Sequence, residues 1–244
     1  MENPKKDSLY ADKQNAIKDF VFDANVADVF EDMIKRSVPG YVAIVAMIGC
    51  LAEEYVGKGT HCYDLGCSLG EVSMSIANNV QADNVKIIAV DNSEAMVEKC
   101  RTNLEKIKSR VPVDIVCNDI KNVDITNASM VVLNFTLQFV EQDQRRGLLQ
   151  KIYDGLCPGG ILVISEKIIF KDEKEQELQI KLHETFKKIN GYSELEIAQK
   201  RTALENVLRP DSMEEHMDRL RSEGFKNIHV WFQCFNFVSM VAFK

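Results

Sequence analysis

The sequence lacks the cysteine and histidine patterns that bind metals or build a disulfide framework. Its seven cysteines include no C-x-x-C pair, and several of them, such as Cys50 and Cys117, lie inside apolar stretches. An odd number of mostly apolar-flanked thiols suits a reducing compartment better than a disulfide-bonded fold. The four histidines lie far apart and show no H-x-x-x-H spacing, which argues against a zinc site. We therefore expect a cytoplasmic protein that holds no metal.

Positive charge and long hydrophobic runs are also scarce. Acidic residues outnumber basic residues by 37 to 30, which gives a net charge of −7. This balance argues against broad binding to nucleic acid or anionic membrane, because such binding needs clustered Lys and Arg. The longest apolar run, residues 41–52, is shorter than the ~20 residues that span a bilayer. Residues 1–18 are polar and contain no signal-peptide pattern. We expect neither direct nucleic-acid contact nor membrane association.

Length and composition are those of an ordinary globular protein. A chain of 244 residues with 45% hydrophobic and 27% charged residues can form one well-buried α/β domain or two small ones. We expect a variable polar tail over residues 1–21 and a single domain over residues 22–244.

The order of apolar segments predicts an α/β architecture. Helical spacing covers residues 25–35 and 41–55, with a break at the proline and glycine of residues 37–40. Short apolar runs then alternate with helical stretches, which predicts a parallel sheet covered by helices on both faces. The expected strands are residues 61–66, 86–91, 113–117, 130–135 and 161–165, and the expected helices are residues 71–78, 93–109 and 142–156.

The C-terminal third has a different pattern. Residues 167–209 are highly charged and helical in spacing, and they are long for a simple crossover connection. They form either a solvated helical insertion or a substrate lid or dimer surface. Helical spacing returns over residues 212–224, and residues 229–232 and 237–243 predict an antiparallel hairpin.

The motif YDLGCSLGE, residues 63–71, occupies the first strand-to-helix turn. A glycine there permits a sharp turn and close approach of a ligand. In dinucleotide-binding proteins a second glycine contacts the pyrophosphate, but this chain has Ser68 at that position and its next glycine is Gly70. The pattern resembles the first motif of the class I methyltransferases, whose ligand has no phosphate.

Polar residues follow the next three strands at the same edge of the predicted sheet. Asp91 ends the second strand, where a carboxylate can accept hydrogen bonds from both ribose hydroxyls of an adenosine; the alternative is a cap for the helix that follows. Asp119 follows the third strand, where the resemblance to the class I methyltransferases implies an acidic residue near the adenine amino group; the alternative is a simple turn. Asn134 ends the fourth strand, where it either contacts the methionine part of the ligand or caps the strand.

A more selective resemblance lies in six segments distributed along the chain. Together they closely resemble the bacterial carboxy-S-adenosyl-L-methionine synthases, over the region from about residue 22 to the C-terminus. The segments are residues 36–41 (RSVPGY), 63–70 (YDLGCSLG), 128–139 (ASMVVLNFTLQF), 190–197 (NGYSELEI), 199–201 (QKR) and 231–237 (WFQCFNF).

This resemblance implies a Rossmann-like class I methyltransferase fold, with a mostly parallel seven-stranded sheet, a C-terminal antiparallel hairpin and a helical insertion. It also implies an enzyme that converts S-adenosylmethionine and prephenate into carboxy-S-adenosylmethionine, phenylpyruvate and water. The product supplies the carboxymethyl group for tRNA wobble uridine modification through a separate enzyme. A homodimer is implied as well.

The resemblance assigns site residues by position. Arg201 is expected to bind the carboxylate on the sulfonium arm, since a guanidinium matches a carboxylate with two hydrogen bonds; the residues alone would suggest a solvated charge on an exposed helix. No protein general base is evident, because His183 lies in the insertion and is expected at the surface. The residues expected to line the nucleoside and methionine pocket are Tyr41, Gly66, Cys67, Ser68, Asp91, Asn92, Asp119, Ile120 and Asn134.

Two other functions share much of this pattern. An ordinary methyltransferase acting on a small acidic metabolite or on tRNA would use the same fold and pocket but would leave S-adenosylhomocysteine. A noncatalytic S-adenosylmethionine-binding module would regulate a partner. Arg201 and the neighbouring GYSELEI segment argue against the first, and the complete set of pocket residues gives no reason to prefer the second.

Overall fold

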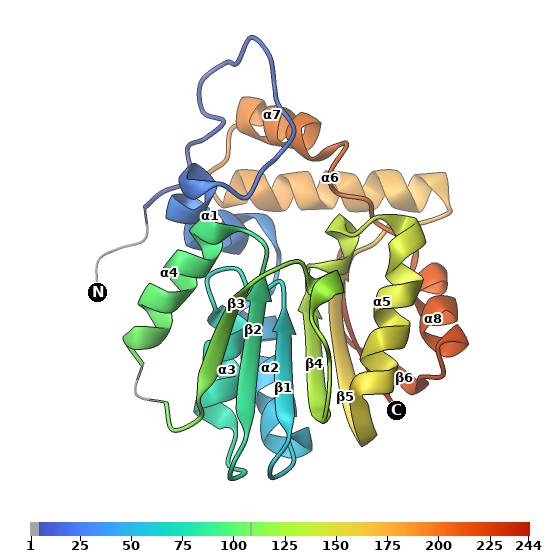
Figure 1. Ribbon diagram of the computed structural model, residues 1–244. Helices are drawn as coiled ribbons and strands as arrows, with labels where there is room; N and C mark the ends of the chain where they lie inside the picture. The colour runs from blue at the N-terminus through green and yellow to red at the C-terminus, as the bar shows by residue number, and fades with distance from the viewer. Residues whose placement is uncertain (1–4, 108) are drawn as a thin grey trace.

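The computed structural model describes residues 5–107 and 109–244 (Figure 1). Its seven strands are β1 (His61–Leu65), β2 (Lys86–Asp91), β3 (Val113–Cys117), β4 (Ala128–Asn134), β5 (Leu156–Lys167), β6 (Lys226–Cys234) and β7 (Phe237–Phe243). The helices are α1 (Ala24–Ser37), α2 (Tyr41–Tyr55), α3 (Glu71–Asn79), α4 (Glu94–Glu105), α5 (Gln142–Gly155), α6 (Glu173–Ile189), α7 (Glu194–Leu204) and α8 (Met213–Ser222), with short 3-10 helices η1 (Ile120–Asn122) and η2 (Leu137–Phe139).

All strands belong to one sheet with the order β3-β2-β1-β4-β5-β7-β6. β1 to β5 are parallel, and β7 runs antiparallel to both β5 and β6. The predicted mostly parallel sheet with an antiparallel C-terminal hairpin is confirmed. The strand order reverses between β1 and β4, and in open α/β sheets such a reversal leaves a crevice at the carboxyl ends of the strands.

Helices cover both faces of the sheet because its central strands are apolar on both sides. In β4, Met130 and Val132 pack with α2 and α3, whereas Val131 and Leu133 pack with α5 and α8. Alternate residues of a strand point to opposite faces, so one continuous apolar run fills two cores. Each fully buried Val, Leu, Ile or Met side chain stabilises the fold by about 1.5–3 kcal/mol relative to exposure.

Local side-chain hydrogen bonds set where the helices begin. The Asp23 carboxylate accepts a hydrogen bond from the Val26 amide and starts α1, and the Ser93 hydroxyl does the same for α4. Ser193 and Ser212 begin α7 and α8 with reciprocal capping boxes. Gly40 separates α1 from α2 at a φ of 77°, and a Cβ there would lie 2.2 Å from the Phe232 ring. Only glycine fits this turn without strain.

Most element boundaries agree with the sequence-based predictions to within two residues, and three elements differ by more. β5 begins at Leu156 because Leu156 pairs with Ala128 ahead of a register shift. α4 ends at Glu105, and the remainder of its predicted span includes residue 108, which lies outside the described residues. β6 is longer than predicted because irregular pairing lets it follow β7 over Lys226–Cys234.

The helical insertion lies above the carboxyl ends of the parallel strands. It consists of α6 and α7, and Figure 1 shows both crossing that end of the sheet beside the N-terminal segment. Residues 5–21 contain no helix or strand but bind α7: the Gln199 amide donates to the Tyr10 and Asp12 carbonyls at 2.9 Å, and the Phe20 amide to the Ala203 carbonyl at 2.8 Å. Residues 1–4 of the predicted tail lie outside the described part of the chain.

In that described part, no individual helix has the length and apolar content needed to cross a membrane. α1 and α2 meet this criterion only together, as a pair bent by 95°.

Candidate active site

A cavity of about 430 Å³ opens at the carboxyl ends of the strands, under α6 and α7. Its volume falls within the range of small-molecule sites. All of the predicted site residues except Arg201 line it, namely Tyr41, Gly66, Cys67, Ser68, Asp91, Asn92, Asp119, Ile120 and Asn134.

The β1–α3 turn forms one wall of this cavity with its backbone. Gly66 has a φ of 84°, and a Cβ there would lie 2.4 Å from the Thr136 hydroxyl. Ser68 is also in the left-handed region, at a φ of 48°. The Gly66 and Cys67 amides donate to the Val90 carbonyl at 2.7 and 2.9 Å, which ties the turn to β2. Strained backbone of this kind persists where neighbouring structure fixes it, often beside a ligand.

Asp91 connects the first turn to the end of β2. Its Oδ2 accepts a hydrogen bond from the Ser68 amide and its Oδ1 accepts one from the Ser93 amide, both at 2.9 Å. Burial raises the pKa of this carboxyl, while the backbone amides act in the opposite direction. A carboxylate has about four lone-pair positions, so Asp91 can hold the turn and still accept hydrogen bonds from a ligand. Both interpretations from the sequence are therefore compatible.

Asn134 lies where β4 ends, beside the reversal of strand order. Its Oδ1 is buried and has no hydrogen-bond partner among residues 5–107 and 109–244. The following residue, Phe135, adopts a φ of 60° and donates its amide to the Ser165 carbonyl at 2.7 Å. Buried polar atoms are nearly always hydrogen-bonded in proteins, so this oxygen fits an ammonium or amide donor of a bound molecule.

Asp119 and Tyr41 also line the cavity. The Asp119 Oδ1 accepts from the Lys121 amide at 2.9 Å, which starts η1 and positions buried Ile120. Tyr41 is the first residue of α2, and burial, followed by the charge of Glu71, raises the pKa of its hydroxyl. The Tyr41 hydroxyl therefore stays protonated near neutral pH and can donate a hydrogen bond.

Arg201 lies outside this cavity. It is on α7, its side chain is 64% exposed, and it forms an ion pair with Glu184 of α6. An exposed ion pair of this kind contributes only about 0–1 kcal/mol to the stability of the fold. A single chain therefore does not bring Arg201 to the other site residues, and its assigned role stays a prediction.

His183 is buried, and the prediction that it lies at the surface is wrong. It is 6% exposed and lines the cavity, with its Nε2 2.8 Å from the Ser37 carbonyl oxygen. Burial and the nearby Lys187 charge lower its pKa to about 2, so the ring is neutral at pH 7 and only weakly basic. The physical reason is that α6 lies across the sheet edge and turns this face inward, although the helix is rich in charged residues.

Two groups of cavity residues were missed by the sequence reasoning. Aromatic side chains form the wall next to α1, with Phe22 packed edge-on to Phe139 at 5.2 Å. Lys167, Lys187 and Lys200 form another wall. The spacing of four residues between His183 and Lys187 places both on one face of a helix, which was a usable signal.

Comparisons with known proteins identify the relatives of this chain. A family model described as "Methyltransferase domain" matches residues 63–160. The carboxy-S-adenosyl-L-methionine synthase of Shewanella sediminis is 55% identical over 99% of this chain and 100% of its own length. That of Actinobacillus pleuropneumoniae is 56% identical over 98% of this chain and 99% of its own.

The chain belongs to the carboxy-S-adenosyl-L-methionine synthase family. It is accordingly an enzyme of that family. Its fold is similar to the solved magnesium protoporphyrin IX methyltransferase from Synechocystis PCC 6803 with bound SAH, with a TM-score of 0.60 at 13% identity over 87% of each chain. At this identity the similarity shows the fold, which is that of the class I methyltransferases.

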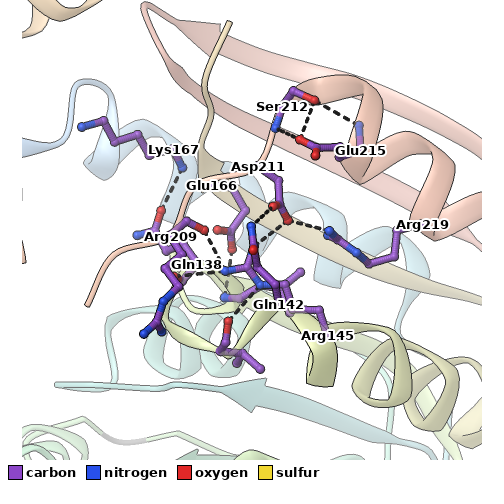
Figure 2. Close-up of polar contacts among 12 residues, drawn as sticks. Gln138, Gln142, Arg145, Glu166, Lys167, Arg209, Asp211, Ser212, Glu215 and Arg219 are labelled. Atoms are coloured by element: carbon purple, nitrogen blue, oxygen red, sulfur yellow. Dashed lines mark hydrogen bonds and ion pairs between the residues drawn. The ribbon is translucent and has the colours of Figure 1, made fainter. Parts of the chain in front are cut away.

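In this synthase-family structure, a buried polar network holds η2 beneath the cavity (Figure 2). Arg145 is fully buried and pairs with Asp211 at 2.5 Å, and Arg219 pairs with the same carboxylate at 2.6 Å. Glu166 accepts a hydrogen bond from the Leu137 amide at 3.0 Å. The network fixes the segment that follows Asn134 and the end of β5.

Glu166 gives this network a pH dependence that we expect to be measurable. Burial raises its pKa to about 8, against the opposing effect of Arg145. The folded state thus holds a proton that the unfolded state releases near its ordinary pKa of 4.5, so the free energy of unfolding falls as pH rises from 4.5 to 8. Urea unfolding measures this effect. Between pH 6 and 7.5 the free energy of unfolding of the wild type should fall by roughly 2 kcal/mol more than that of a Glu166→Gln variant.

An exposed carboxylate provides the control for this comparison. Glu105 ends α4 at the surface, so a Glu105→Gln variant should follow the wild-type pH profile. Parallel profiles for wild type and Glu166→Gln would contradict the protonation assigned to Glu166.

Proposed function

We propose that this chain converts S-adenosyl-L-methionine and prephenate into carboxy-S-adenosyl-L-methionine, phenylpyruvate and water. The observation that carries the proposal is near-full-length identity of 55% to a curated carboxy-S-adenosyl-L-methionine synthase. The cavity supports it, since the residues expected around the nucleoside and methionine converge there.

The cavity offers complementary groups for each part of S-adenosylmethionine. Asp91 takes the ribose hydroxyls, Asp119 and Ile120 the adenine, and Asn134 the methionine part, where its buried Oδ1 lacks a partner within the described residues. Gly66, Cys67 and Ser68 permit close approach of the backbone, Asn92 borders the adenosine, and Tyr41 closes the side next to α2. We propose no metal in this reaction.

The proposed reaction balances in atoms and charge. A carbon–carbon bond forms between the methyl carbon on sulfur and the carboxyl carbon that leaves the prephenate ring. The bonds from the ring to that carboxyl and to the hydroxyl break, and the ring becomes aromatic. The methyl proton combines with the departing hydroxide to give water. Holding both substrates in one cavity replaces a bimolecular encounter, and the cover formed by α6 and α7 limits escape of the one-carbon fragment.

We propose that the protein acts as a homodimer with Arg201 near the subunit boundary, where it binds the new carboxylate. Arg201 is exposed beside the cavity rather than within it. The same two helices expose several large apolar side chains, namely Leu178, Ile180, Ile189 and Leu195. Large exposed apolar side chains are common at protein–protein contacts.

The product would serve tRNA wobble uridine modification through a separate carboxymethyl-transferring enzyme. The net charge of −7 favours a reaction on small molecules rather than direct tRNA contact. We place the protein in the cytoplasm, because its cysteines, several of them buried, are unpaired thiols that suit a reducing compartment.

The test is mass spectrometry of the products after incubation of the protein with both substrates. Carboxy-S-adenosylmethionine and phenylpyruvate in equal amounts are the expected result. S-adenosylhomocysteine formed with an added acceptor, without carboxylated product, would overturn the proposal in favour of an ordinary methyltransferase.

Replacing Arg201 with alanine should separate carboxylate recognition from nucleoside binding. We expect formation of the carboxylated product to fall about 100-fold, because a bidentate charged contact is lost. The dissociation constant of S-adenosylmethionine, measured by calorimetry, should change by less than about threefold. Arg221→Ala, at an exposed position on α8, is the control, and wild-type turnover by Arg201→Ala would reject the assigned role.

A further inference from the structure

One wall of the cavity carries three lysines from three separate elements. Lys167 ends β5, Lys187 lies on α6 and Lys200 lies on α7. Ser165 of β5 pairs with Asn134 at the end of β4. Lys167 comes two residues after Ser165 and lines the cavity next to Asn134. The lysines therefore lie beside the end of the cavity assigned above to the methionine part and the reacting methyl group.

The positive charge on this wall has little compensation from the protein. The Lys200 ammonium donates to the Ser37 hydroxyl at 3.1 Å and lies 3.7 Å from the Asp7 carboxylate. Neither Lys167 nor Lys187 has an ion-pair partner within 4.0 Å in the described part of the chain, and the charged groups that act on them are other cations. His183, on the same wall, is neutral and adds no counter charge.

Clustered, buried ammonium groups are unfavourable in the ligand-free protein. Burial and the neighbouring lysines lower the pKa of Lys187 to about 7, and burial lowers the pKa of Lys200 to about 8 despite Asp7. The pKa of Lys167 is lowered as well, by burial and then by Arg201. Like charges held together in a cavity fit a ligand that supplies the opposite charge.

We propose that Lys167, Lys187 and Lys200 form the subsite that binds the two carboxylates of prephenate. This inference rests on the proposed function, which supplies the dianion. S-adenosylmethionine matches the wall poorly, because its sulfonium is repelled by ammonium groups and its single carboxylate is accompanied by its own amino group. The two carboxylates of prephenate, one on the ring and one on the side chain, balance two of the three cations.

The subsite has a defined pH dependence. Prephenate binds the charged lysines, so its affinity is highest below pH 7 and falls as pH rises through 7 to 8. The charged or titratable groups around Lys200 are Asp7, Asp32, Arg36 and Tyr192. Those around Lys187 are Lys200 and Lys167, and Arg201 faces Lys167. His183 stays neutral over this range and contributes nothing to the change.

Calorimetry with prephenate, on protein saturated with unreactive S-adenosylhomocysteine, tests the subsite. Lys167→Met, Lys187→Met and Lys200→Met should each raise the prephenate dissociation constant about tenfold or more, with less than a threefold change for S-adenosylhomocysteine. Lys187→Arg should bind prephenate with an affinity within about fivefold of the wild type. Its affinity should also depend less on pH between 7 and 8, because Arg does not titrate there. Lys181→Met, at an exposed position of the same helix, is the matched control.

A second measurement excludes a merely structural role. Removal of a partly buried cation that lacks an ion-pair partner within the described residues should raise the midpoint of thermal unfolding of Lys187→Met by about 2 °C or more, while prephenate binding is lost. A variant that weakened binding by damaging the fold would unfold at a lower temperature instead.

The outcomes separate this inference from the proposed function. If the wild type forms carboxylated product and the lysine variants bind prephenate like the wild type, the inference is overturned and the function stands. If the variants weaken the binding of S-adenosylhomocysteine instead, the lysines bind the carboxylate of its amino-acid part, and the inference is also overturned. If no product forms but prephenate still binds in a lysine-dependent way, the function fails and the anion subsite stands.

Discussion

Replacing Asp91 with alanine is expected to weaken S-adenosylmethionine binding about 100-fold. Hydrogen bonds to a charged group contribute about 1.5–3 kcal/mol each when they are buried, and a carboxylate at the end of β2 is placed to accept two from the ribose. The substitution also frees the Ser68 amide, which Asp91 holds at 2.9 Å, and thus loosens the turn that approaches the ligand. Isothermal titration calorimetry with S-adenosylmethionine measures the change.

The control for Asp91 is a carboxylate on the neighbouring strand that does not reach the cavity. Asp114 of β3 is exposed and pairs with Lys86 at the surface, so Asp114→Ala should leave the affinity unchanged. Equal affinities for Asp91→Ala and the wild type would reject the ribose contact and leave Asp91 with its role as a helix and turn anchor.

The second large effect concerns stability rather than binding. An Asp211→Ala variant should lose about 3–5 kcal/mol of unfolding free energy, because it leaves a buried cation without its partner. Asp211 is 2% exposed and accepts from Arg145 at 2.5 Å, Arg219 at 2.6 Å and Gln142 at 3.0 Å (Figure 2). Whole domains have only about 5–15 kcal/mol of stability, so urea unfolding should show a clearly lower midpoint.

An exposed ion pair on the neighbouring helix shows how much of this loss comes from burial. Glu214 of α8 pairs with Lys171 at the surface, and Glu214→Ala should lower the urea midpoint only slightly. Similar losses for Asp211→Ala and Glu214→Ala would mean that the Arg145 charge is not desolvated as the structure indicates.

The nucleoside side of the cavity was predictable because its signals are local. Gly66, Asp91 and Asn134 each stand at the end of an apolar strand, and parallel strands bring their carboxyl ends to one edge of a sheet. The order of strands and helices could be read in the same way. Periodicity fixed the type of each element, whereas the start of β5 depended on pairing between Leu156 and Ala128 that no local pattern reveals.

The cationic side could not be predicted in this way. Lys167, Lys187 and Lys200 meet only because α6 and α7 fold back over the sheet. In the sequence, Lys187 and Lys200 lie among other charged residues, which looks the same as a solvated surface, and Lys167 simply ends an apolar strand. His183 was misplaced for the same reason: the composition of a helix does not say which of its faces is covered by another element.

The two sides of the cavity come from different stretches of the chain. Residues on the nucleoside side lie between Tyr41 and Asn134, whereas the lysines and His183 follow Glu166. Recognition of the donor and recognition of its reaction partner can therefore diverge independently during evolution. Exchange of the segment that contains α6 and α7 between homologues is a direct route to synthases that carboxylate the same sulfonium from a different acid.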